Sequence, residues 1–366
     1  MDHALFSPLQ LRSVTIPNRI GVSPMCQYSS QDGFANDWHL VHLGSRAVGG
    51  AGLVIVEASA VTPQGRITPA DMGIWKEEHI ANLARIVRFL NARGARAGIQ
   101  LAHAGRKASM SPPFKGERLL TSEEGGWTTV APSAIPFSDR YSQPVALDKA
   151  GIEAIKEAFV IATRRAEAAG FDFLEIHAAH GYLLHEFLSP LSNQRVDDYG
   201  GSFDNRVRLL LEVTAAVRKT WPEHLPLSVR ISATDWVEGG WTIDDSVQLA
   251  KRLRELRVDM IDCSSGGNVP NVKMPVAPGY QAPFAARIKK EAGIATAAVG
   301  MITEPVQANR IIAEGEADIV LLAREMLRDP YFAVHAAAAM QEPATWPEQY
   351  LRAAPPQSQP RAPIAK

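Results

Sequence analysis

The strongest constraint on the fold is a repeat in which eight short apolar runs alternate with eight longer amphipathic segments. The apolar runs predict buried strands at residues 20–25, 52–58, 95–102, 171–177, 225–232, 258–264, 294–300 and 317–323. The other segments predict helices at residues 38–48, 79–93, 148–169, 205–221, 242–257, 280–292, 304–313 and 329–340. Such alternation is typical of an α/β protein with a parallel sheet, and the count favours a closed (β/α)8 TIM barrel. A doubly wound sheet is the alternative, but its dinucleotide-binding form needs a GxGxxG motif after an early strand, which is missing.

Two regions fall outside the repeat. Residues 104–147 follow the third strand and are rich in Gly, Pro and Ser. Loops of this length in compact proteins are usually functional, so we expect a lid or subdomain over the mouth of the barrel. Residues 343–366 form a Pro-rich tail. Residues 1–342 are therefore expected to form a single barrel domain that includes the insertion.

Composition excludes several classes of function. With 38 basic and 39 acidic residues, the chain has no general attraction to nucleic acid or to anionic lipid. Cys26 and Cys263 lie far apart, and no CxxC pair is present for zinc or an iron–sulfur cluster, so no metal site is expected. No apolar run approaches the roughly 20 residues of a membrane helix. We therefore expect a cytoplasmic protein without a nucleic-acid or membrane partner.

The run His177-Ala-Ala-His180-Gly-Tyr182 follows the fourth predicted strand. If the chain leaves the strand near His177 and turns, two imidazole N–H groups can converge on one point, with a phenol close by. Two donors and a weak acid suit enolate chemistry, in which an oxygen gains negative charge and a carbon receives a proton. The alternative is that both histidines are simply paired with neighbouring backbone.

In a barrel of this kind the carboxyl ends of the strands face the active site. The residues at these ends are Ser23-Pro24-Met25-Cys26 with Tyr28 beyond, Glu57-Ala58, Gln100 to His103, His177, Arg230, Ser264 to Gly267, Gly300, and Ala323-Arg324. The loops after the last two strands often bind phosphate. Glycine at position 300 lets the backbone approach an anion, and Arg324 can add a forked contact. A glycine turn beside a surface arginine is the alternative.

Two polar residues in core strands need partners. Arg230 ends a core strand, and a buried cation requires an anionic partner, either a reduced flavin or a nearby carboxylate. Gln100 offers an amide donor and acceptor, which suits a ring with alternating carbonyl and N–H groups.

Two rival sites can be drawn from the same strand ends. Glu57 and Glu175 would be a glycosidase pair, but Glu175 shares a strand face with His177 and lies deeper, so we expect a buried ion-pair partner. His39 and His103 leave a metal hydrolase open, although the HAAH run does not fit the HExxH zinc pattern.

Blocks of sequence in a fixed order carry a resemblance to one family. They are SPMCQY at 23–28, VEASAV at 56–61, QLAHAGRKA at 100–108, EIHAAHGYLLHEFLSPLSNQR at 175–195, DDYGGSFDNR at 197–206, VGMI at 299–302 and REMLRDP at 324–330. With these blocks the chain resembles the old yellow enzymes, and it is most similar to the bacterial branch with a cysteine near the flavin. The resemblance runs from about Leu5 to Tyr350.

The resemblance implies an FMN-dependent NADPH dehydrogenase, or ene-reductase, on a (β/α)8 barrel. NADPH would reduce tightly but non-covalently bound FMN, and an α,β-unsaturated carbonyl compound would then accept hydride from the reduced flavin. Transferred residue by residue, the resemblance assigns the FMN site to Ser23, Pro24, Met25, Cys26, Ala58, Gln100, Arg230, Gly300, Ala323 and Arg324. Among these, Cys26 would tune the flavin potential, and Gly300, Ala323 and Arg324 would hold the phosphate.

The resemblance also implies roles for the residues around the substrate. His177 and His180 would bind the carbonyl oxygen, and Tyr182 would protonate the α-carbon. Tyr28 would help to position the substrate, and Lys107 would lie close to the site.

The chain departs from the family pattern at two places. Ala323 stands where similar sequences usually have glycine, which adds a methyl group to the phosphate loop. The tail reads Tyr350-Leu-Arg352-Ala-Ala, whereas the branch tends to end in a Tyr-x-Arg-Gly-Trp-like sequence. The resemblance implies a homodimer or homotetramer in which Arg352 reaches the substrate site of a neighbouring subunit, here without the Gly-Trp support.

Three other functions are weighed against this one. A dienoyl-CoA reductase shares a related barrel but needs a cysteine cluster, which two isolated cysteines exclude. A metal-dependent or glycoside hydrolase on the same barrel and a non-catalytic flavin-binding protein remain as alternatives.

Overall fold

Eight parallel strands close into a barrel in the computed structural model, which describes residues 4–356 and 358–364. The barrel strands are β3 (Ile20–Val22), β4 (Leu53–Ala60), β5 (Arg96–Ala102), β8 (Phe173–Ala178), β9 (Leu227–Ser232), β10 (Met260–Ser264), β11 (Ala295–Val299) and β12 (Ile319–Leu322), and β12 pairs with β3 to close the ring. The predicted (β/α)8 barrel is confirmed, and the doubly wound alternative is wrong because an open sheet would leave two unpaired edges.

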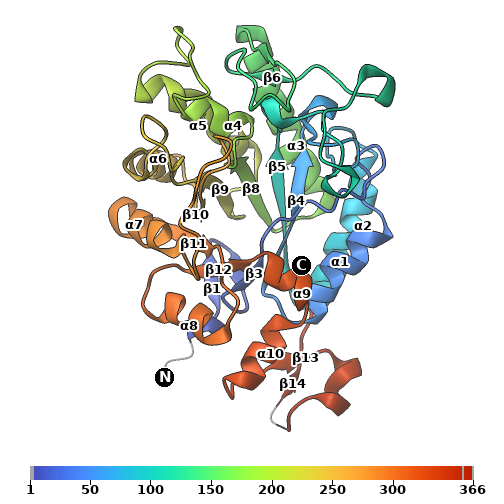
Figure 1. Cartoon of the computed structure of the whole chain (residues 1–366). Coiled ribbons are helices and arrows are strands. Elements are labelled where there is room, and N and C mark those ends of the chain that lie inside the picture. The colour runs from blue at the N-terminus through green and yellow to red at the C-terminus, as the bar shows by residue number, and fades with distance from the viewer. Residues whose placement is uncertain (1–3, 357, 365–366) are drawn as a thin grey trace.

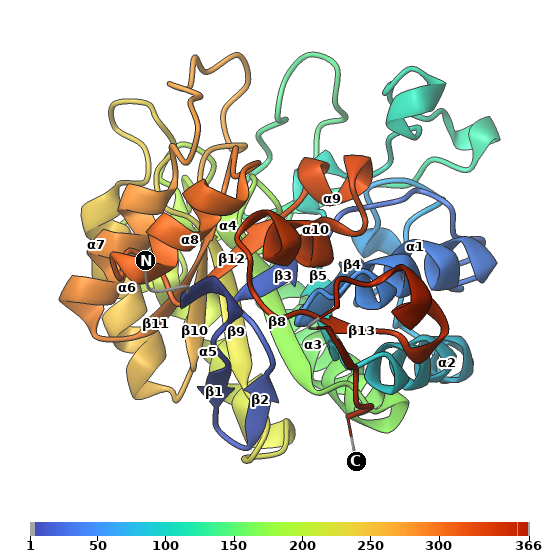
Figure 2. The ribbon, with the colours of Figure 1, turned by 90° about the horizontal axis from the view of Figure 1, so that it is seen from below.

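Helices surround the barrel. They are α1 (Asp37–Val48), α2 (His79–Ala92), α3 (Lys149–Ala169), α5 (Phe203–Thr220), α6 (Ile243–Glu255), α7 (Ala282–Ala292), α8 (Pro305–Ala313) and α10 (Phe332–Ala339). In Figure 2 the strands lie in the centre, with α6, α7 and α8 on one side and α1, α2 and α3 on the other. Each predicted helix is present, with its ends shifted by a few residues.

Local chemistry explains the ends of several elements. The first barrel strand stops at Val22, earlier than predicted, because Pro24 has no N–H for the ladder. The Thr242 side chain accepts from the Asp245 N–H in a capping box at the start of α6. Helix α3 ends at Gly170, whose φ of +85° is the left-handed conformation that glycine adopts without steric cost.

Several short elements lie outside the predicted repeat. They are the hairpin β1 (Leu9–Leu11) and β2 (Val14–Ile16), helices α4 (Leu183–Leu188) and α9 (Arg324–Arg328), strands β6 (Val130–Ala131), β7 (Val145–Ala146), β13 (Thr345–Trp346) and β14 (Gln359–Pro360), and the 3-10 helices η1 (Ala4–Phe6), η2 (Pro63–Gly65), η3 (Gly105–Lys107), η4 (Pro113–Lys115), η5 (Ser122–Glu124) and η6 (Glu348–Ala353). Residues 104–147 hold η3, η4, η5, β6 and β7, and the label of β6 lies at the top of Figure 1, near α4. The tail holds β13, η6 and β14, while its residues 357, 365 and 366 lie outside the described part. Among the described helices, none is long and apolar enough to cross a membrane.

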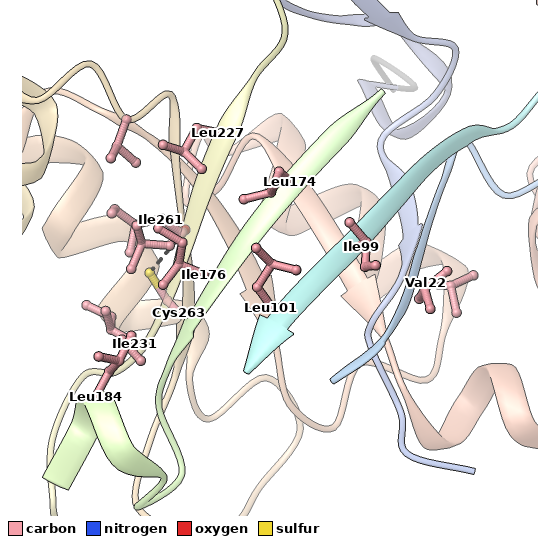
Figure 3. Close-up of a cluster of buried hydrophobic side chains, with 14 of the residues drawn as sticks. Val22, Ile99, Leu101, Leu174, Ile176, Leu184, Leu227, Ile231, Ile261 and Cys263 are labelled. Carbon is pink, nitrogen blue, oxygen red and sulfur yellow. Dashed lines mark hydrogen bonds between the residues drawn. The ribbon is translucent and has the colours of Figure 1, made fainter. Parts of the chain in front are cut away.

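Alternate residues of each strand face the surrounding helices. Figure 3 shows Ile99 and Leu101 of β5, Leu174 and Ile176 of β8, and Ile261 of β10 within one cluster of buried side chains. This layer between barrel and helices is the main hydrophobic core.

The residues between them point into the barrel and form two tiers. Near the amino ends of the strands the interior is apolar, with Phe173, Met260 and Leu321 packed in one cluster with Ile16 of the β1–β2 hairpin. Because strand starts and hairpin share this cluster, the hairpin closes the amino end of the barrel. The row that holds Met260 also holds three buried polar residues, Gln100, Glu175 and Ser228. Ser23, Arg230, Asp262 and Ser264 are buried beyond it, towards the carboxyl ends of the strands.

The hairpin plug can be tested with Ile16→Ala. The Ile16 side chain is fully buried in the lower tier, so its truncation should lower the free energy of unfolding by about 2–4 kcal/mol. Urea unfolding of the variant measures the loss. Thr15→Ala, on the exposed face of the same strand, is the control and should change stability by less than about 0.5 kcal/mol. Similar losses in the two variants would contradict the plug.

Candidate active site

The register of three neighbouring strands aligns three side chains in one row. Arg230 of β9 is the register partner of both His177 of β8 and Asp262 of β10. The Arg230 Nε lies 3.1 Å from Asp262 Oδ2, and its Nη1 donates to Ser23 Oγ at 3.0 Å. Burial raises the pKa of Asp262, and the Arg230 charge opposes that shift. The carboxylate that Arg230 needs is therefore Asp262.

One level deeper lies a second polar group. Gln100 Nε2 donates to Glu175 Oε1 at 2.9 Å, and Ser228 Oγ donates to Glu175 Oε2 at 3.2 Å. Glu175 is buried as predicted, and burial is the main cause that raises its pKa. The prediction that Glu175 is an ion-pair partner is wrong, because the Arg230 guanidinium pairs with Asp262 and Glu175 accepts its hydrogen bonds from the uncharged side chains of Gln100 and Ser228.

The predicted turn after His177 is present. Strand β8 ends at Ala178, and His180 and Gly181 take the left-handed conformation with φ of +59° and +71°. The Tyr182 N–H donates to Ala179 O at 3.2 Å, and α4 begins at Leu183. The His177 ring centroid lies 5.1 Å from that of His180 and 5.1 Å from that of Tyr182, in both cases edge to face. The two imidazoles and the phenol therefore converge.

Two glycines let this turn approach the loop after β10. A Cβ at Gly181 would lie 2.3 Å from Gly267 O, and a Cβ at Gly267 would lie 2.7 Å from His180 Cα. Because both positions have positive φ, glycine suits the backbone conformation as well as the space. Backbone contact between the two loops thus sets the position of His180 and Tyr182.

Both site histidines are neutral imidazoles at neutral pH. Burial, and then the positive charge of Arg230, lowers the pKa of His177 and His180 well below the ordinary value. Nδ1 of His177 accepts from the Ala179 N–H at 3.3 Å, so its proton is on Nε2, and Nε2 is a hydrogen-bond donor. A neutral donor can bind a carbonyl oxygen and stabilise it as it gains negative charge.

The tyrosine keeps its proton. Burial is the main cause that raises the pKa of Tyr182 well above its ordinary value. Lys107 Nζ lies 5.1 Å from the centre of the Tyr182 ring and donates to the carbonyls of His180 (2.9 Å) and Gly267 (3.1 Å). Lys107 therefore lies at the site, in accord with the sequence.

The predicted cofactor residues on the first three barrel strands lie around the same rim. Ala58 of β4 is the register partner of Gln100 of β5, and Ser23, Pro24, Met25 and Cys26 follow β3. Burial raises the pKa of the Cys26 thiol, so it stays protonated at neutral pH. Tyr28 takes a φ of +49° and packs edge to face on Phe114 of η4, with ring centroids 6.4 Å apart.

The three predicted phosphate residues share one cavity. Gly300, Ala323 and Arg324 line a space of about 310 Å³ together with Arg328. Gly300 has a φ of +118°, which L side chains rarely adopt, and a Cβ there would lie 2.6 Å from Gln281 Nε2, so glycine suits the backbone that borders the cavity. Arg324 is exposed, and its Nη2 lies 3.8 Å from Met301 Sδ. Arg328 is paired with Glu325, which lines the same cavity, at 2.6 Å, so Arg324 beside the glycine backbone is the cation best placed for an anion.

The structure separates the residues of the rival sites. Glu57 lies at a register shift of β4 between Val56 and Ala58, accepts from the Gln27 N–H at 3.1 Å and lies 3.8 Å from His39 Nε2 of α1. Glu175 is held by Gln100 and Ser228, so the two carboxylates belong to separate networks. Among the described residues, no group of three His, Cys, Asp or Glu side chains is placed to hold a metal ion.

Two residues of the site were missed from the sequence, and one predicted residue lies away from the site. Asp262 and Gln281 were not singled out from the sequence, although an aspartate inside the apolar run Met260-Ile-Asp-Cys263 is a readable signal of a buried charge. Arg352 lies apart from the site within one chain. It is exposed on η6, which follows β13 at the bottom of Figure 1, whereas α4 lies at the top.

Comparisons with known proteins give the family and the fold to which the chain is similar. The sequence model described as "NADH:flavin oxidoreductase / NADH oxidase family" matches residues 4–342. An NADPH dehydrogenase of Geobacillus sp. (strain WCH70) is 50% identical over 354 residues, which cover 96% of this chain and 99% of that protein. Morphinone reductase in complex with tetrahydroNAD superposes with a TM-score of 0.77 at 26% identity, over 92% of this chain and 90% of that one. A 2-naphthoyl-CoA reductase complex gives a TM-score of 0.85 at 26% identity, over 93% of this chain, which spans 53% of that longer one.

The backbone contact between Gly181 and the Gly267 carbonyl can be tested by substitution. Gly181→Ala and Gly201→Ala both place alanine at positive φ, which costs about 1–2 kcal/mol, but a Cβ at Gly201 meets no atom within 4 Å. The clash of Gly181→Ala with the Gly267 carbonyl should cost about 1–3 kcal/mol more. Urea unfolding of both variants measures the difference. Equal losses would show that the two loops are not in backbone contact.

Proposed function

The chain belongs to the NADH:flavin oxidoreductase / NADH oxidase family, and on that premise we propose that it reduces carbon–carbon double bonds conjugated to a carbonyl group. The resemblance to the old yellow enzymes is confirmed by the family match over residues 4–342 and by the Geobacillus NADPH dehydrogenase that is 50% identical. The protein is an FMN-dependent NADPH dehydrogenase. The main support for an α,β-unsaturated carbonyl compound as its substrate is the close approach of the His177, His180 and Tyr182 rings.

The residues at the rim fit FMN. The cavity bordered by Gly300, Ala323 and Arg324 suits the phosphate, and the polar upper tier of the barrel offers Gln100 and Arg230 to a ring with carbonyl and N–H groups. When bound, FMN supplies the hydride chemistry that links NADPH oxidation to substrate reduction.

The two histidines bind the substrate oxygen in this proposal. Their rings are neutral because burial and Arg230 disfavour the protonated form, so they act as neutral hydrogen-bond donors. As the double bond is reduced, negative charge develops on this oxygen, and donors fixed in a buried site stabilise it without reorganisation.

Tyr182 provides the proton. Its phenol remains protonated at neutral pH because burial raises its pKa, and its ring lies 5.1 Å from that of His177. The phenol can thus give its proton to the α-carbon of a substrate whose oxygen the histidines hold. Tyr28, at the rim beside Phe114, would help to position the rest of the molecule.

Three further assignments complete the proposal. Cys26 would act as a protonated thiol that tunes the flavin potential, since burial disfavours the thiolate that a nucleophile needs. Residues 104–147 would form the lid of the single domain 1–342. Arg352 would bind substrate in the site of a second subunit, because η6 carries it away from the site of its own chain.

An anaerobic spectrum tests the function directly. The purified protein should show a flavin absorbance that NADPH bleaches and that cyclohexenone restores. A flavin band that NADPH bleaches but no enone restores would contradict the proposed substrate class. A colourless protein whose activity depends on a divalent metal would favour the hydrolase alternative.

The role of Tyr182 is tested with Tyr182→Phe. Because the variant lacks the acid that protonates carbon, reoxidation of the reduced protein by cyclohexenone should slow at least 100-fold. Reduction by NADPH should change less than about threefold, because that step needs no proton from Tyr182. Stopped-flow absorbance separates the two half-reactions.

Tyr199→Phe serves as the matched control, because the Tyr199 hydroxyl donates to Glu212 on α5 and not into the site. It should leave both half-reactions within about twofold of the wild type. Equal slowing of the two half-reactions in Tyr182→Phe would remove the phenol as the acid.

A further inference from the structure

A hydroxyl at the end of β10 contacts the ring of His180. Ser264 Oγ lies 2.7 Å from His180 Nε2, and Ser264 is 5% exposed. The sequence places Ser264 at a strand end but gives it no role. The short contact between a buried hydroxyl and a site imidazole shows that the two groups share one hydrogen bond.

Two hydrogen bonds fix the backbone of His180. Its backbone N–H donates to Ser232 Oγ at 2.9 Å, and its carbonyl accepts from Lys107 Nζ at 2.9 Å. Ser232 of β9 is the register partner of Ser264 of β10, so both serines occupy the uppermost inward position of neighbouring strands. These contacts fix the backbone at a φ of +59°, and from this position the ring reaches Ser264.

The direction of this hydrogen bond decides which nitrogen of His180 carries the proton. A neutral imidazole has one N–H and one lone pair. If Nε2–H donates to Ser264, Nδ1 presents a lone pair and repels a carbonyl oxygen. If the Ser264 hydroxyl donates to Nε2, Nδ1 carries the proton and can donate to that oxygen. Only the second arrangement gives the site two donors.

We propose that Ser264 is a positioning residue whose hydroxyl donates a hydrogen bond to His180 Nε2. This hydrogen bond keeps the proton of the ring on Nδ1, where it can be donated to the substrate oxygen. This rests on the proposed function, in which both histidines bind the carbonyl group. The two imidazoles then hold opposite tautomers, because the Ala179 N–H fixes the His177 proton on Nε2.

The surroundings of His180 keep its ring neutral, so only the position of its single proton can vary. The groups that act on its ring are Arg230 from β9, Lys107 from η3, His177 from β8 and His185 from α4. Their effects, added to that of burial, all lower its pKa, so the ring is neutral at neutral pH.

The wild-type holoenzyme gives the first test. In protein labelled with ¹⁵N at histidine, the nitrogen shifts distinguish a protonated from an unprotonated ring nitrogen. The His180 signals, identified by their loss in His180→Gln, should show a protonated Nδ1 and a bare Nε2. The reverse pattern would overturn the proposal. Because this measurement needs no turnover, it stands even where the enone assay fails.

A pair of isosteric variants gives the second test. Ser264→Thr keeps the hydroxyl, whereas Ser264→Val has the same shape as threonine without it. Ser264→Thr should keep the Nδ1–H tautomer, and Ser264→Val should lose it. Ser264→Val should bind cyclohexenone to the oxidised holoenzyme about tenfold more weakly than Ser264→Thr, the effect of one net hydrogen bond.

The same pair in a His180→Ala background separates this role from packing. Without the imidazole, Thr and Val at position 264 should bind cyclohexenone within about twofold of each other. A tenfold difference that persists there would overturn the proposal, because the hydroxyl would then act independently of His180. An unchanged tautomer in Ser264→Val would overturn it as well.

Discussion

The register of β8, β9 and β10 is the constraint on which the rest of the site depends. It places His177, Arg230 and Asp262 in one inward row, and Ser232 and Ser264 in the row above. Side chains alternate along a strand, so a slip of one residue would turn every one of these groups into the hydrophobic layer beneath the helices. The apolar lower tier fixes this register, because Phe173 and Met260 must point into the barrel for the hairpin to cover them.

The row also sets the charge of the site. The Arg230 guanidinium is balanced by Asp262, so the upper tier holds no unpaired buried charge among the described side chains of this row. Burial is the main cause that lowers the pKa of His177 and His180, and the same guanidinium adds to it, so both remain neutral donors. The pairing with Asp262 therefore makes it possible to bury an arginine whose charge also disfavours protonation of the two histidines at the end of β8 and in the turn that follows it.

The sequence predicts the large repeat and misses what is short or non-local. Long apolar and amphipathic segments identify all eight barrel strands and their helices, whereas β1 and β2 have three residues each and show no usable period. Helix α4 is buried along its whole length, so it has no amphipathic stripe. The turn at His180 is predictable because Gly181 follows it, but the pairing of Arg230 with Asp262 depends on strand register, and no spacing along the chain reveals it.

Ala323 departs from the family pattern at a position whose φ does not itself call for glycine. Its φ of −104° is negative, outside the left-handed region that favours glycine. The added methyl belongs to the wall of the cavity that Arg324 and Gly300 also line. Gly300 differs, because its φ of +118° is one that L side chains rarely adopt. Position 300 therefore keeps the glycine that close backbone approach to an anion calls for, whereas the methyl group at position 323 lies in the lining of the same cavity.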